Sequence, residues 1–80
     1  MIIVKIKSSS KFTDILPVIL DDAMLRKDNH IVLLCDKGGL DRLRVVLNGH
    51  KKVGRVLAGA EMIYCIKDMR IQLEEIEYEI

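Results

Sequence analysis

The segment His30-Ile31-Val32-Leu33-Leu34-Cys35-Asp36-Lys37-Gly38-Gly39-Leu40 decides the fold of this chain. Residues 30–35 form a nearly unbroken apolar run, which is typical of a strand covered on both faces. Polar and glycine residues follow, and leucine and valine then recur at helical spacing as far as Leu47. The segment therefore predicts a central strand that leads through a short turn into an amphipathic helix.

A similar strand and helix precede this segment. Isoleucine, valine and lysine alternate over residues 2–7, and this period of two predicts a strand with one face toward the core. From Phe12 to Met24 the apolar residues lie on one helical face. Pro17 is best tolerated in a first helical turn, so we expect the helix to start near Thr13, with Ser10 or Thr13 as its capping residue.

Two assignments are possible after the second helix. Asn48-Gly49 suits a left-handed helix terminus, which predicts that the helix ends there. The same pair is also a strong hairpin signal, so residues 44–47 and 53–57 form an alternative β-hairpin. Two glycines weaken either assignment over residues 50–60, which we leave open.

The remaining chain predicts two strands, from Glu61 to Ile66 and from Arg70 onward, with a turn at Lys67-Asp68. The resulting order is β-α-β-α-β-β. Because right-handed crossovers place successive helices on the same face, this order predicts an α/β (α+β) two-layer sandwich with one mixed sheet and two helices on one face. Eighty residues provide one hydrophobic core, so residues 1–80 form a single domain.

The composition is that of a folded globular chain, with 50% hydrophobic and 31% charged residues. Its charge is unevenly distributed. Residues 1–59 contain eleven Lys and Arg against six Asp, whereas residues 60–80 contain five Glu and one Asp against two cations. The N-terminal apolar run is too short for a signal peptide and no run is long enough to cross a bilayer, so we expect a cytoplasmic protein without a membrane segment.

No catalytic, metal or cofactor signature is visible. Cys35 and Cys65 each lie within an apolar run, which predicts buried free thiols. His30 and His50 are not at metal-ligand spacing from either cysteine. The carboxylates show no diagnostic pairing, and the Gly-Gly turn matches neither nucleotide-binding fingerprint. We therefore expect no enzyme activity, no metal and no cofactor.

The chain resembles the Alba family of small nucleic-acid-binding proteins and the related stage V sporulation protein S family. The resemblance is carried by residues 5–10, Lys-Ile-Lys-Ser-Ser-Ser, before the first helix, by Ile31-Val32, and by Lys37-Gly38 at the start of the second helix. It implies a homodimer that binds nucleic acid through the first strand-to-helix loop and the start of the second helix. By position, it assigns this contact to Lys7, Lys11, Lys37, Arg42 and Arg44.

Charge clustering adds three candidates. Nucleic-acid binding depends on Lys and Arg that neutralise phosphates, and Lys51, Lys52 and Arg55 extend the basic set of the second helix. Few aromatic residues are available for base stacking, so contacts to phosphate are expected to dominate. Two functions stay open: a homodimer that binds DNA or RNA, and a non-enzymatic structural or interaction module with a protein partner.

Overall fold

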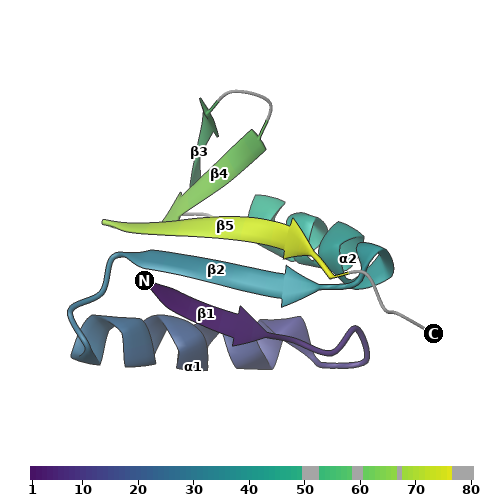
Figure 1. Ribbon diagram of the computed structural model, residues 1–80, viewed down its shortest axis with the longest axis horizontal. Helices are drawn as coiled ribbons and strands as arrows, with labels where there is room; N and C mark the ends of the chain where they lie inside the picture. Colours follow the sequence, from purple (N-terminus) through teal and green to yellow (C-terminus); the bar gives the residue numbers. More distant parts are fainter. Residues whose placement is uncertain (50–52, 59–60, 67, 77–80) are drawn as a thin grey trace.

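The computed structural model describes residues 1–49, 53–58, 61–66 and 68–76. Figure 1 shows one sheet with both helices behind it, which confirms the two-layer sandwich. The elements in chain order are β1 (Ile2–Lys5), α1 (Phe12–Leu25), β2 (His30–Cys35), α2 (Lys37–Asn48), β3 (Val53–Ala58), β4 (Glu61–Ile66) and β5 (Met69–Glu75). Neither helix, within these described ranges, has the length and apolar character needed to cross a membrane.

The sheet has the strand order β1-β2-β5-β4-β3. β2 pairs in parallel with β1 and with β5, while β4 pairs antiparallel with β5 and with β3. The carboxyl ends of β1, β2 and β5 therefore lie at the same end of the molecule, toward which their arrowheads point in Figure 1. Loops that follow β1 and β2 are brought together at that end.

The core lies between the helices and one face of the sheet. Alternate residues of β2, Ile31, Leu33 and Cys35, are almost fully buried. Residues on the inner faces of the helices pack with them, because the helical spacing seen in the sequence places them on one side. These helix residues are Phe12, Leu16, Ala23, Leu40, Leu43 and Leu47.

Residues 53–58, in the stretch that the sequence left open, form a strand. β3 pairs with β4 from Val53 opposite Ile66 to Ala58 opposite Glu61. The alternative hairpin was wrong in its partner, because residues 44–47 are helical and the strand pairs with the segment after it. The structure thus adds a fifth strand to the four predicted.

The helix ends differ from the expected caps. α1 begins one residue before Thr13, but neither Ser10 nor Thr13 caps it, since its N-cap is Lys11 without a side-chain bond. Gly49, which caps α2, has a φ of −79°, so the left-handed terminus expected there was wrong. Among the described residues that carry a side chain, Lys27 after α1 is left-handed, with a φ of 55°.

Candidate nucleic-acid interface

The carboxyl edge, defined here as residues 6–11 and 36–44, contains five of the eight predicted basic residues. Residues 6–11 connect β1 to α1, and residues 36–44 begin α2 directly after β2. The Ile6 N–H donates to the Leu34 carbonyl at 2.8 Å, which extends the pairing of β1 and β2 into the first loop. The topology therefore joins two basic segments that are about thirty residues apart in sequence.

Gly39 allows α2 to approach the first loop closely. A Cβ at this position would lie 2.1 Å from the Cys35 Sγ and 3.2 Å from the Ser8 Cβ. Carbon atoms in contact prefer separations of about 3.5–4.0 Å, so no side chain fits without displacing its neighbours. Gly39 thus has a packing role at the start of α2.

Asp36 links the same two segments. Its carboxylate caps α2 by accepting a hydrogen bond from the Gly39 N–H at 2.8 Å. This bond and a second from the Ser8 hydroxyl lower the pKa of Asp36 from its ordinary value. Asp36 and Ser8 were not among the predicted site residues, although an aspartate just after a buried strand and three residues before Gly39 is a recognisable N-cap signal.

Arg42 is bound to the first loop. Its guanidinium donates to the Ser8 carbonyl and, at 3.4 Å, to the Ser10 carbonyl. The same group lies over the Phe12 ring, 4.8 Å from the ring centroid, in a cation–π contact. Arg42, which was predicted to contact phosphate, therefore holds the shape of the loop between Lys7 and Lys11.

The other described candidates differ in their ionic partners. Arg44 donates to the Asp41 carboxylate at 3.0 Å. Lys7, Lys11 and Lys37 are exposed. Within the described ranges, none of these three ammonium groups is paired with a carboxylate. The edge thus presents three lysines whose charges are available to an anionic ligand.

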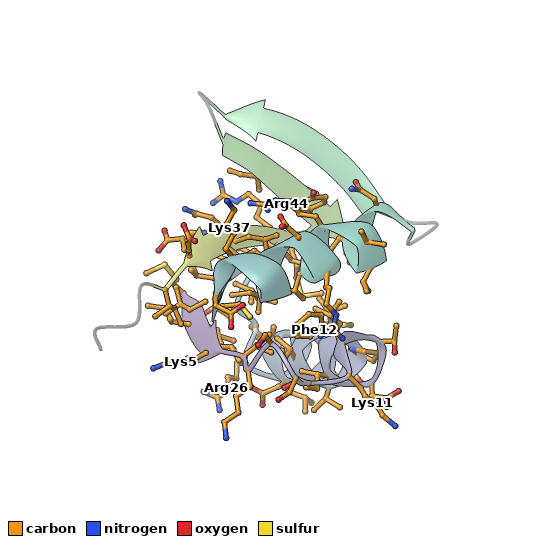
Figure 2. The ribbon with its side chains drawn as sticks, turned by 90° about the vertical axis from the view of Figure 1, so that its right-hand side faces the viewer. Lys5, Lys11, Phe12, Arg26, Lys37 and Arg44 are labelled. Carbon is orange, nitrogen blue, oxygen red and sulfur yellow. The ribbon has the colours of Figure 1, made fainter. Side chains whose placement is uncertain are left out.

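Figure 2 looks directly at the carboxyl edge. Lys37 and Arg44 lie beside α2, on the side of the β3–β4 hairpin, whereas Lys11 lies on the opposite side, next to α1. The cations are thus spread across the edge instead of surrounding one point. Such spacing suits a ligand with several separated negative charges better than a single small anion.

Three predicted residues cannot be placed in this interface. Lys51 and Lys52 lie outside the described residues. Arg55 belongs to β3, where it pairs with Tyr64, and its side chain is also outside the description.

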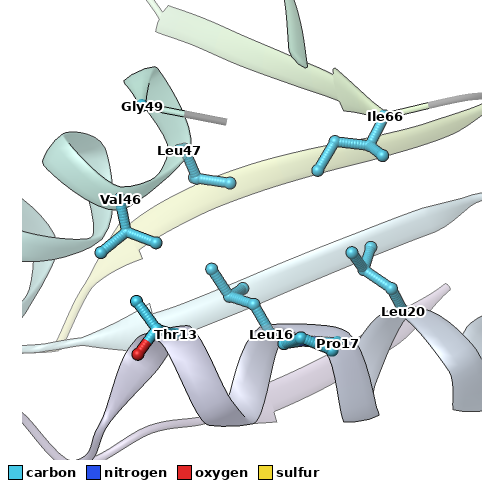
Figure 3. Close-up of a pocket in the computed structure, with 8 residues that line it drawn as sticks. All are labelled: Thr13, Leu16, Pro17, Leu20, Val46, Leu47, Gly49 and Ile66. Carbon is cyan, nitrogen blue, oxygen red and sulfur yellow. The ribbon is translucent and has the colours of Figure 1, made fainter. Parts of the chain in front are cut away.

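A concave feature lies away from the carboxyl edge residues, between the helices (Figure 3). It is a groove of about 230 Å³. Its lining is almost entirely apolar, and comprises Thr13, Leu16, Pro17, Leu20, Val46, Leu47, Gly49 and Ile66. Only Thr13 brings a polar side chain. No group of three or more potential metal-ligating side chains occurs in the described parts of the chain.

Comparison with protein-family models, with curated proteins and with solved structures gives no match for this chain.

Proposed function

We propose that this protein is a non-enzymatic nucleic-acid-binding protein that contacts the phosphate backbone, independently of base sequence, through its carboxyl edge. The observation that carries the proposal is the exposure of Lys7, Lys11 and Lys37 at one edge without ionic partners in the described structure. Neutralising phosphates with such cations releases counterions from the nucleic acid and supplies most of the affinity of sequence-independent binding.

The aromatic residues favour phosphate contact over base stacking. Phe12 is 2% exposed and Tyr64 is 3% exposed, so neither offers a surface on which a base can stack. Phe12 is also covered by the Arg42 guanidinium. Of the described residues, the lysines are left as the main contacts, and Arg44 joins them if phosphate displaces Asp41.

The proposal follows the Alba-like resemblance in using the loop after the first strand and the start of the second helix. It includes a cytoplasmic location and a homodimer. The two cysteines, which are both free, suit a reducing compartment. Lys51, Lys52 and Arg55 complete the proposed set of contacts, adding to the basic side chains at the start of α2.

The experiment is the salt dependence of binding to a random-sequence DNA duplex and to an RNA duplex, measured by fluorescence anisotropy. The three lysines at the carboxyl edge of one chain contribute about −2.7 to the slope of log K against log salt on B-DNA, since each contact contributes about −0.9, and each further contact makes the slope steeper. Lys37→Ala should reduce the slope by about 0.9 and weaken binding to all sequences alike.

The matched control is Arg26→Ala. Arg26 is also an exposed cation on a helix, but it caps the far end of α1 and pairs with Asp22 at 3.0 Å. It should leave the slope unchanged. Absence of binding to either duplex at about 50 mM salt, or an equal effect of the Arg26 and Lys37 variants, would contradict the proposal.

The groove between the helices favours a second candidate function, an interaction module with a protein partner. Exposed apolar residues on the outer surfaces of the helices, among them Val18 and Val45, strengthen this reading. A substitution inside the groove, Leu20→Lys, should then abolish capture of a protein partner while leaving duplex binding intact. Loss of duplex binding with this variant would count against treating the groove as a separate site.

A further inference from the structure

The face of the sheet opposite the helices, called the open face here, is organised in rows. Strand register places residues of β1, β2 and β5 side by side across it. From the carboxyl end, the rows are Lys5, Leu34 and Glu74, then Ile3, Val32 and Gln72, and then His30 and Arg70. Figure 2 shows Lys5 directed away from the helices, as this register requires.

The middle of this face is apolar. Val32 and Leu34 occupy the central strand, where Val32 is only 5% exposed, and Ile3 beside them on the edge strand β1 is 57% exposed. A partner surface that covers Ile3 would remove this exposure.

The polar residues of the face are held in place by one another. The His30 Nε2 lies 3.3 Å from the Gln72 Oε1, and the Gln72 Nε2 donates to the Glu74 Oε1 at 3.1 Å. The bond from Gln72 holds the Glu74 carboxylate beside its own strand, β5. Lys5 lies in the same row on β1, with β2 between the two charges.

This row of charges is self-complementary under one symmetry. A two-fold axis parallel to β2 leaves β2 facing β2 and exchanges β1 with β5. Lys5 of each copy then faces Glu74 of the other, while Val32 and Leu34 face their own equivalents. A two-fold axis that is perpendicular to the strands and parallel to the sheet would instead bring Lys5 toward the amino end of the partner's β1. The Asp28 carboxylate at that end is already paired with the N-terminal ammonium.

We propose that a second copy of this chain docks on the open face, with its strands aligned and Lys5 and Glu74 paired across the interface. Two sheets pack face to face about 10 Å apart with strand directions within about 30° of each other, which long side chains such as lysine and glutamate can span. The isologous contact closes on itself and produces a dimer instead of a filament.

The axis has a consequence for the carboxyl edge, and this consequence alone depends on the proposed function. Because the axis runs along the strands, both carboxyl edges lie at the same end of the dimer. Six lysines, Lys7, Lys11 and Lys37 from each copy, then face one nucleic acid. The dimer predicts a salt slope of about −5.4, twice that of one chain.

The test is sedimentation of the full chain over about 10–500 μM, a range that covers weak and moderate dimers. Glu74→Lys and Lys5→Glu each place like charges together twice and should weaken the dimer by about tenfold or more. The double variant, with the charges exchanged, should return to within about threefold of the wild-type dissociation constant.

Val18→Asp is the matched control. Val18 is an aliphatic residue about as exposed as Ile3, at 67% against 57%, but it lies on a helix and not on the open face. It should leave dimerisation unchanged. A wild-type chain that stays monomeric throughout, a double variant that does not recover, or dissociation by Val18→Asp would each overturn the inference. A dimer that binds no duplex leaves the inference standing and removes the proposed function.

Discussion

The substitution Gly39→Ala tests the contact that joins α2 to the first loop. Its new Cβ would lie 2.1 Å from the Cys35 Sγ, against a contact distance of about 3.5–4.0 Å. Cys35 is fully buried in the central strand, so a turn of its sulfur away from Gly39 would bring it against other closely packed core atoms. Either the first turn of α2 or the end of β2 must therefore move.

The expected effect combines two opposing terms. Overpacking of a buried contact costs about 1–3 kcal/mol, whereas alanine is favoured over glycine in a helix by about 0.5–1 kcal/mol. Cys35→Ala alone should cost about 1–2 kcal/mol through lost packing. With the sulfur absent, the nearest obstacle is the Ser8 Cβ at 3.2 Å, so Gly39→Ala should cost about 0.5 kcal/mol or less in that background. The double variant should thus be about 1–2 kcal/mol more stable than the sum of the single effects.

The assay is urea unfolding of the four chains of this double-mutant cycle, with the slope m checked for constancy. Gly38→Ala is the control, because a Cβ there meets only the Asp36 Oδ1 at an ordinary 3.6 Å. It should be neutral or stabilising by about 0.5 kcal/mol. Additive effects of the two substitutions within about 0.3 kcal/mol, or a Gly39→Ala variant as stable as Gly38→Ala, would refute the close-contact argument.

Three further predictions concern other parts of the fold. Lys27→Gly should raise stability by about 0.5–1 kcal/mol in thermal unfolding, because the φ of 55° strains a side-chain-bearing residue; a destabilised variant would contradict this. The pKa of Asp36 is lowered in the folded state, so its contribution to stability is complete above the ordinary value of 3.8 and is lost as the pH falls through the folded value. Urea unfolding of Asp36→Asn should show a weaker pH dependence below pH 4 than wild type, and an unchanged dependence would argue against the hydrogen bonds to this carboxylate. Arg42→Gln should speed amide exchange at Ser10 and weaken duplex binding without changing the salt slope, whereas a slope reduced by about 0.9 would make Arg42 a phosphate contact.

Local pattern was sufficient for most of the fold. The apolar run at residues 30–35 and the two helical faces were each recognisable alone, since burial on a fixed period leaves a direct trace in the sequence. β3 was only one of two open assignments, because Gly54 weakens strand propensity and the local sequence does not show which segment pairs with this strand. The hairpin signal at Asn48-Gly49 also offered residues 44–47 as an alternative partner for this strand. Tertiary pairing with β4 resolved that competition.

The candidate site was predictable in its location but not in its division of roles. Lys37 and Arg42 look alike in the sequence, because each is a cation near the start of the second predicted helix. What separates them is a hydrogen bond between Arg42 and Ser8, thirty-four positions away, and a ring beneath the guanidinium. A guanidinium presents several donors in a plane and suits such a fixed contact, whereas a lysine ammonium on a flexible stem suits an exposed, adaptable contact to phosphate. The arginines and lysines of the carboxyl edge therefore differ in their surroundings: Arg42 and Arg44 bind groups of the protein, whereas Lys7, Lys11 and Lys37 are exposed.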